Sequence, residues 1–393
     1  MKKFLLAVFL ISNVISSQEI INDTLQTTRQ DLDEVIVKGI RAKFSSPISF
    51  TNVDKQDLKS KNLGQDLPIL LNFLPSVVTT SDAGAGIGYT GIRIRGVSPQ
   101  STNITINGIP FNDPESMGTF WVNLPDFSSS IESLQVQRGV GTSTNGSGAF
   151  GASINILTDI VSDQPYAELS SSFGSYNTLK NTIKFSTGKI NDYFELSGRL
   201  SKIDSDGYVD RAYSDLKSYF IQGAYTNGST LIKAISFGGH EKTYQAWDGL
   251  SMDQVEENRR QNPLTYENEI DNYKQDHFQL HWNEKINNYW SFNLGLNYTD
   301  GRGYFEQYKE DDDINTYGGI VKSDIDSNGN ETGTTDLIRR RWLDNDFYVL
   351  NSSINYIKDK IDLTLSSSYS SYVGDHYGDC LLYTSDAADD SLR

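Results

Sequence analysis

The sequence predicts a mainly β protein in which a small α+β domain is followed by an incomplete antiparallel transmembrane β-barrel. The barrel is predicted because apolar and polar residues alternate from about Tyr166 onward, in runs of about ten residues that suit a tilted membrane strand. It is also predicted because the links between these runs are mostly short at one end and long at the other. The α+β domain is predicted because helix-like and strand-like patterns are mixed over residues 48–160.

The N-terminus has the pattern of a secretory signal peptide. Lys2 and Lys3 precede the apolar run 4–14 and a pair of serines. We therefore expect residues 1–17 to direct export; an N-terminal membrane anchor is the alternative, but the apolar run is shorter than the roughly 20 residues of a spanning helix. Residues 18–47 are mostly polar, which indicates a flexible arm.

Composition limits the classes of partner. The net charge of −17 excludes nucleic acid, because phosphates would be repelled. A mean hydropathy of −0.46 is compatible with a barrel, since only alternate residues of each strand face lipid, and 22 Tyr and 18 Phe fit the aromatic girdles of such barrels. The single cysteine, Cys380, allows neither a disulfide framework nor a cysteine metal cluster.

Residues 48–160 are expected to form one compact α+β unit. Two short helices are predicted at 54–63 and 67–74, and the second should end before Pro75. Short strands are expected around Ile92, Ile104, Leu134 and Ile154.

Residues 161–379 are expected to supply about nine barrel strands. Tight links are predicted at 189–192, 227–229, 287–288 and 358–360, and long ones at 204–213, 241–272 and 301–342. The short link 174–177 breaks this alternation. Because single-chain bacterial barrels have even strand numbers, we expect the chain to hold only part of the wall. The strand pattern stops after Asp379, so residues 380–393 are predicted to be non-native; a natural hydrophilic terminus is the alternative.

Several segments resemble motifs of TonB-dependent outer-membrane receptors, with a Bacteroidetes-like character. The segments that resemble their plug domain are 91–96 (GIRIRG), 106–110 (INGIP), 136–140 (VQRGV) and 146–155 (GSGAFGASIN). The β-prone island Asp33, Glu34, Val35, Ile36 and Val37 resembles a TonB box, which in this family lies in a periplasmic arm; an ordinary β-prone linker is the alternative.

The resemblance implies a receptor in the cell outer membrane, surrounded by outer-membrane lipid. TonB, working with ExbB and ExbD, would energise uptake of a scarce large ligand, a ferric siderophore or another iron or cofactor complex. The alternatives are a non-transporting surface receptor or adhesin, and an importer of oligosaccharides or peptides. Too few residues separate the signal peptide from the box for an extra N-terminal domain, which argues against a signal-transducing receptor and the usual glycan importer.

Six plug residues are candidates for function. Arg93, Arg95 and Arg138 are expected to pair with carboxylates of the wall, although solvated arginines are the alternative. At the predicted plug apex, the aromatic side chains available for ligand contact are Tyr89, Phe120 and Trp121. These three rings could instead pack the plug against the wall.

No motif in the sequence predicts an enzyme, a cofactor site or a metal site. Glycine-rich segments lack the pattern of a phosphate loop. His277 and His281 lie four residues apart on a predicted strand, about 13 Å at roughly 3.3 Å per residue, which is too far to share a metal. The segment 324–329 begins like a calcium loop, but Thr335 replaces the bidentate glutamate. We therefore expect neither an enzyme nor a metal site.

Overall fold

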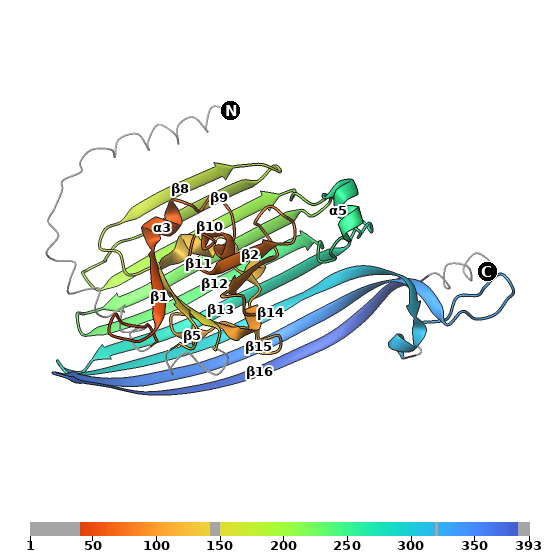
Figure 1. The fold of residues 1–393 in the computed structure, drawn as a ribbon. Coiled ribbons are helices and arrows are strands. Elements are labelled where there is room, and N and C mark those ends of the chain that lie inside the picture. Colours follow the sequence, from red (N-terminus) through yellow and green to blue (C-terminus); the bar gives the residue numbers. More distant parts are fainter. Residues whose placement is uncertain (1–39, 142–149, 319–320, 384–393) are drawn as a thin grey trace, which may run out of the picture. The chain divides into compact units, whose positions relative to one another are not determined.

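The computed structural model describes residues 40–141, 150–318 and 321–383, which form a plug domain and a nine-stranded sheet (Figure 1). The TonB-box residues 33–37 and the predicted signal peptide lie outside these described residues. Among the described residues no helix has both the length and the apolar character needed to cross a membrane.

The plug contains a five-stranded sheet with the order β1-β6-β7-β4-β5. Its strands are β1 (Ser49–Asp54), β4 (Thr102–Ile106), β5 (Ile109–Pro110), β6 (Ile131–Arg138) and β7 (Ala152–Thr158). The β4–β7 pair is parallel and the other neighbours are antiparallel. A separate hairpin joins β2 (Val77–Ser81) to β3 (Thr90–Ile94). The four strands expected from sequence are confirmed as β3, β4, β6 and β7.

The plug helices are shorter than the sequence predicts. Helix α3 (Lys55–Lys59) begins at a capping box made by Asp54 and Asp57, and α4 (Leu67–Leu70) begins with a proline in its first turn. Three short 3-10 turns follow, η1 (Pro99–Ser101), η2 (Trp121–Asn123) and η3 (Phe127–Ser130). Beyond each helix the chain turns more tightly. Lys61 N donates to Leu58 O and Leu74 N donates to Leu71 O, both at 3.0 Å, and these bonds span three residues instead of the four of an α-helix.

The hydrophobic core sits in the plug and extends to the sheet. Plug strands contribute fully buried aliphatic residues such as Ile106, Leu134 and Ile156. The same cluster includes Phe220 and Phe237, which belong to the nine-stranded sheet. Apolar packing therefore joins the two parts, at roughly 1.5–3 kcal/mol for each large side chain removed from water.

The nine-stranded sheet is an antiparallel meander in chain order, and Figure 1 shows its strands side by side. Its strands are β8 (Tyr166–Phe173), β9 (Leu179–Ser186), β10 (Phe194–Ser205), β11 (Ser214–Thr226), β12 (Thr230–Tyr244), β13 (Ile270–Lys285), β14 (Trp290–Asp313), β15 (Thr334–Lys358) and β16 (Ile361–Tyr383). The count and the antiparallel order confirm the predicted barrel strands. Strand β16 includes Cys380 and ends at Tyr383, so the strand continues past the expected end at Asp379.

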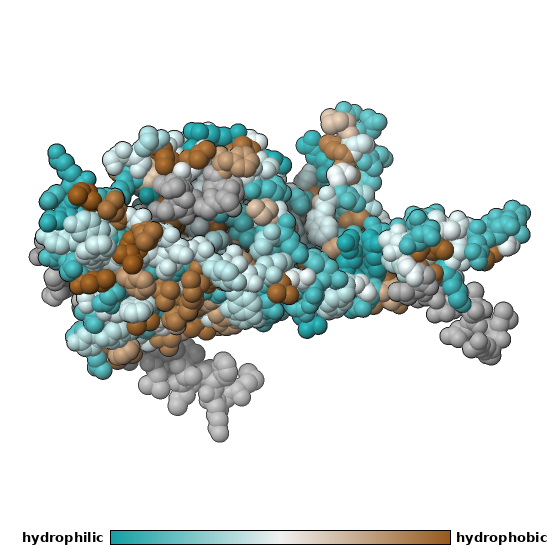
Figure 2. All heavy atoms as spheres, turned by 90° about the horizontal axis from the view of Figure 1, so that it is seen from below, coloured by the Kyte–Doolittle hydropathy of each residue, from teal (hydrophilic) through white to brown (hydrophobic). Residues whose placement is uncertain are grey.

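The sheet buries polar residues and exposes apolar ones. In β9, Lys180 and Lys184 are buried, whereas Ile183 and Phe185 are exposed. This is the reverse of a soluble sheet and is typical of a barrel with a polar lumen and an outer surface in lipid. In Figure 2, hydrophobic side chains gather over the left half of the surface in view, while the segments projecting at its right are mostly hydrophilic.

The loop predicted at 301–342 is much shorter in the structure. Strands β14 and β15 extend through its two ends, and the connection 314–333 contains the 3-10 turn η5 (Ile314–Tyr317). The extension is stabilised across the strands: Arg340 Nε lies 2.7 Å from Glu306 Oε2, and Arg339 Nη1 lies 3.5 Å from Asp312 Oδ2. Of the other two predicted long links, the connection after β12 contains helix α5 (Met252–Asn258), and the connection after β10 consists of residues 206–213.

Candidate functional site

The plug and the sheet are joined by a buried ion-pair cluster centred on Asp126. Its carboxylate, which is fully buried, lies 2.6 Å from Lys180 Nζ and 3.4 Å from Arg199 Nη1. It also accepts a hydrogen bond of 2.7 Å from the Thr182 hydroxyl. Burial by itself would raise the pKa of Asp126, but the Arg199 and Lys180 charges outweigh it and hold the pKa below its ordinary value. The carboxylate is therefore ionised at neutral pH.

A second buried carboxylate, Asp159, lies where the plug chain passes into the sheet. Asp159 Oδ2 is 2.6 Å from Lys184 Nζ of β9, and its Oδ1 is 2.7 Å from Lys55 Nζ of α3. Burial opposes ionisation, yet these two lysines lower the pKa of Asp159. Glu132 also contacts Lys55, at 3.0 Å. The cluster therefore ties α3, the end of the plug and the first part of the wall together.

The three plug arginines were expected to pair with carboxylates of the wall. Within the described part of the chain, no ion pair joins Arg93, Arg95 or Arg138 to the sheet. Arg138 instead donates to Pro75 O at 3.1 Å and to Thr51 Oγ1 at 2.7 Å, both within the plug. Burial and the neighbouring Arg95 lower the pKa of Arg138.

The buried ion pairs have the opposite polarity because β9 and β10 direct their cations to the polar, plug-facing side of the sheet. Lys180, Lys184 and Arg199 are all buried there. Their partners in the plug are the carboxylates of Asp126, just before η3, and Asp159, just after β7. The alternation of the strand sequences could have indicated these inward cations, but it carries no information on their partners. Two exposed pairs, Lys59–Glu168 and Lys43–Asp362, join a plug lysine to a carboxylate of the sheet.

A cavity of about 490 Å³ separates the plug from the sheet near the ends of β12 and β13. We call it the aromatic cavity because its lining includes Tyr89, Phe111, Phe120, Trp247, Tyr273 and Phe305. Its volume is in the range of small-molecule sites. The lining comes from the plug, from the connection after β12 and from five sheet strands, β12 to β16, so a ligand here would contact both parts of the chain.

The three aromatic candidates lie in two different environments. Tyr89 and Phe120 both line the aromatic cavity, and 45% of Phe120 is exposed. Trp121 is only 3% exposed and packs in the hydrophobic core, which matches its alternative packing role. Trp247, which was not predicted from the sequence, lies with its ring centre 5.3 Å from that of Tyr89. Burial raises the pKa of Tyr89, so its hydroxyl stays protonated and can donate.

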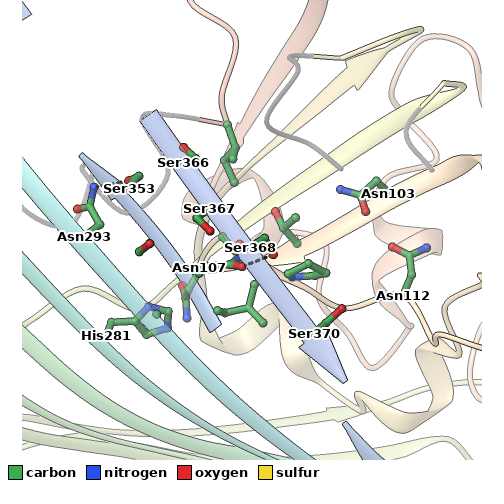
Figure 3. Close-up of a pocket in the computed structure, with 18 of the residues that line it drawn as sticks. Asn103, Asn107, Asn112, His281, Asn293, Ser353, Ser366, Ser367, Ser368 and Ser370 are labelled. Carbon is green, nitrogen blue, oxygen red and sulfur yellow. Dashed lines mark hydrogen bonds between the residues drawn. The ribbon is translucent and has the colours of Figure 1, made fainter. Parts of the chain in front are cut away.

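A second cavity, of about 780 Å³, lies between the plug and strands β13 to β16 (Figure 3). We call it the serine cavity, because serines of β15 and β16 face asparagines of the plug across it. Among its lining residues are Asn107, Asn112, His281, Ser353, Ser366 and Ser368. The plug segment 109–114 borders both cavities. Asn351 Nδ2 donates to Gly108 O at 2.8 Å, which holds the adjoining plug turn against β15.

The two histidines of β13 face different spaces. His277 lines the aromatic cavity, and His281 lines the serine cavity. Over the described residues, no group of three or more His, Cys, Asp or Glu side chains is arranged to hold a metal ion. In the predicted calcium-like segment, Thr335 Oγ1 donates to Asp324 Oδ1 at 3.1 Å, and Asp326 accepts backbone hydrogen bonds within the loop.

Comparison with known proteins identifies the plug. The family described as "TonB-dependent Receptor Plug Domain" matches residues 42–153. The vitamin B12 transporter BtuB of Vibrio vulnificus is 28% identical over 214 residues, which cover 53% of this chain and 33% of that protein. The ferrienterobactin receptor of Escherichia coli is 24% identical over 193 residues, or 45% of this chain and 26% of the receptor.

Solved structures share the whole arrangement of plug and strands. The copper transporter OprC aligns over 86% of this chain and 48% of its own, with a TM-score of 0.64 and 13% sequence identity. The ferric citrate transporter FecA aligns over 93% of this chain and 52% of its own, with a TM-score of 0.60 and 15% identity. The chain thus spans about half the length of these structures. Residues 42–153 match the plug domain of TonB-dependent receptors, and the plug with its nine strands shares the fold of the corresponding part of these solved structures.

Proposed function

We propose that the receptor containing this chain takes up a scarce, bulky metal or cofactor complex across the outer membrane, with energy supplied by TonB, ExbB and ExbD. The names of its relatives support this ligand class, since they include carriers of vitamin B12, ferrienterobactin, copper and ferric citrate. Residues 1–17 would direct export, and the apolar outer face of the sheet would contact outer-membrane lipid.

The aromatic cavity is the observation that carries this proposal. Plug residues such as Tyr89 and Phe120 form one side of it, and sheet residues such as Tyr273 form the other. A ligand bound between two parts of one protein changes the contacts of both, so binding can bias the seating of the plug. A pocket within a single rigid part would have no such effect.

Energy transfer is proposed to act through residues 33–37. An extended segment with β-forming residues can add one strand to the edge of a partner's sheet, and its backbone hydrogen bonds would transmit a pull toward the plug. The buried Asp126 and Asp159 clusters would hold the plug in place until that pull is applied.

The test compares two proline substitutions in the full-length receptor. Ile36→Pro removes a backbone N–H from the predicted box, and Gln26→Pro makes the same change in the arm outside it. In a strain that depends on this receptor for iron or cobalamin, Ile36→Pro is expected to reduce uptake to the level of the gene deletion while ligand binding to cells is retained. Gln26→Pro should leave uptake unchanged.

Two outcomes would favour other functions. Normal uptake by the Ile36→Pro receptor would contradict energised transport through this box. Ligand binding without any receptor-dependent uptake would favour a surface receptor or adhesin. Growth assays that also include oligosaccharides and peptides as single nutrients would identify an importer of those ligands.

A further inference from the structure

We propose that the aromatic cavity selects ligands without net negative charge and binds a cationic group of the ligand between Glu241 and Asp271. The inference rests on the proposed function, because it assigns a charge class to the ligand of that cavity. It separates this receptor from carriers of strongly anionic ferric complexes, whose ligands need compensating positive charge.

The charges that line the cavity are of one sign. Among the described residues, those that line it include five carboxylic side chains, Asp82, Asp113, Glu115, Glu241 and Asp271, and no lysine or arginine. Two of the five are bonded to histidine or to the backbone: Glu115 lies 2.7 Å from His376 Nε2, and Asp113 accepts backbone hydrogen bonds from residues 115 and 116. An anionic ligand would meet repulsion here without a compensating cation from these walls.

Glu241 and Asp271 are buried without a cationic partner. They lie on the neighbouring strands β12 and β13, where Thr243 pairs with Asp271 in the register. They are 1% and 8% exposed. Within the described residues, neither forms an ion pair, and the side chains that donate to them are neutral hydroxyls.

Those hydroxyls leave the site able to accept a cation. Thr243 Oγ1 donates to Glu241 Oε2 at 2.8 Å. The Tyr89 hydroxyl contacts both Glu241 Oε1 and Asp271 Oδ2. These hydroxyls are neutral and do not cancel the charge of either carboxylate, and two like charges held close together disfavour each other's ionisation. A ligand ammonium or a similar group would relieve this repulsion and would replace lost hydration.

Aromatic rings beside the carboxylates add a second surface suited to cations. The Trp247 ring makes edge-on contacts with Tyr89 and with Phe305, at centroid distances of 5.3 and 5.7 Å. The faces of such rings attract cations by about 0.5–2 kcal/mol. The Arg341 guanidinium lies 5.5 Å from the centre of the Phe305 ring, but Arg341 is not among the cavity's lining residues.

Two further side chains indicate a missing polar partner. His277 and Asn345 both line the cavity and are 4% and 7% exposed. His277 Nδ1 contacts Thr299 Oγ1 at 2.8 Å and Asn345 Nδ2 donates to the Tyr273 hydroxyl at 3.2 Å, yet His277 Nε2 and Asn345 Oδ1 have no hydrogen-bond partner. Buried polar atoms are seldom left unsatisfied, so a bound ligand would supply these bonds.

The experiment measures binding to the purified full-length receptor in detergent, without TonB. One probe is a ferric trihydroxamate that carries a free ammonium group, and the other is an anionic ferric tris-catecholate. We expect the cationic probe to bind at least about tenfold more tightly, since a difference of 1.4 kcal/mol suffices. The double variant Glu241→Gln/Asp271→Asn should lose that preference, whereas Glu256→Gln, an exposed carboxylate of α5, should keep it.

The charge preference of the unmodified receptor tests the inference even if the double variant fails to fold. Tighter binding of the anionic probe, equal binding of both, or no binding of the cationic probe would overturn it. So would an unchanged preference in a folded double variant. Because this assay needs no energy, its failure leaves TonB-dependent uptake standing, and normal uptake by Ile36→Pro would leave the charge assignment standing.

Discussion

Replacing Asp126 with asparagine tests whether the buried ion pairs seat the plug against the wall. Asp126 has a positive φ of 52°, a conformation that asparagine tolerates, so the substitution removes charge with little backbone strain. Lys180 and Arg199 would then face a neutral amide while remaining buried. Their charges would lose the only carboxylate that either one pairs with among the described residues.

The expected magnitude follows from burial. Removing one partner of a buried ion pair costs about 3–5 kcal/mol, which corresponds to a roughly hundred- to several-thousandfold increase in opening of the plug contact. The control is Glu168→Gln. Its pair with Lys59 is 2.8 Å long, but the side chains are 43% and 61% exposed, and exposed pairs are worth about 0–1 kcal/mol.

Hydrogen exchange of the backbone amides in η3 and β6, measured on the full-length receptor in detergent, reports this opening. Asp126→Asn should accelerate exchange there by roughly two orders of magnitude or more, and Glu168→Gln should change it little. Because the pKa of Asp126 is lowered, its stabilising contribution is complete above the unfolded value of about 3.9 and is lost only as pH falls through the lower folded value. The difference between variant and wild type should therefore be the same at pH 6 and pH 8. Equal exchange in the two variants would refute the reasoning.

Two further predictions concern the seating and the stability of the plug. A Cβ atom at Gly239 of β12 would lie 2.4 Å from Asn123 O and 2.6 Å from Pro125 Cδ, both in the plug. The substitution Gly239→Ala should therefore unseat the plug and expose it to added protease. The control Gly223→Ala should not, because a Cβ atom there would have no neighbour within 4 Å. Equal protection in both would show that close backbone approach is not required. Burial raises the pKa of Asp66, so its contribution to stability is full below about pH 3.9 and declines as pH rises through the raised folded value. The gain in melting temperature from Asp66→Asn should thus be larger at pH 8 than at pH 4, and a constant gain would contradict that sign.

Local patterns were sufficient to predict the wall. The alternation of apolar and polar residues predicted the strand type and a sheet with one apolar and one polar face, because the period of two is a property of the extended backbone itself. The starts of both plug helices were predicted to within one residue, at 54 and 67, and the structure places a capping box at the first and a proline in the first turn of the second. The helix ends were misjudged because apolar residues continue through the tighter turns after each helix, so the pattern does not show where the α-helix stops.

The candidate site was only partly predictable. Tyr89 and Phe120 were identified from their place in loops, but Glu241, Asp271 and Trp247 were not. Glu241 lies in β12, Trp247 lies in the connection after it, and Asp271 lies in β13. Both strands contain several other polar residues, and only the register between them brings two carboxyls beside one tyrosine.

The sequence by itself determined the division into plug and wall, the antiparallel strands and their two faces, because each depends on neighbours within a few residues. The tertiary structure alone decided which charges meet across the plug interface, how far β14 and β15 extend, and where the cavities lie. Asp126 and Lys180 are 54 positions apart in the chain, and Tyr89 and Asp271 are 182 apart. Interactions at such separations depend on how whole elements pack, which local periodicity does not encode.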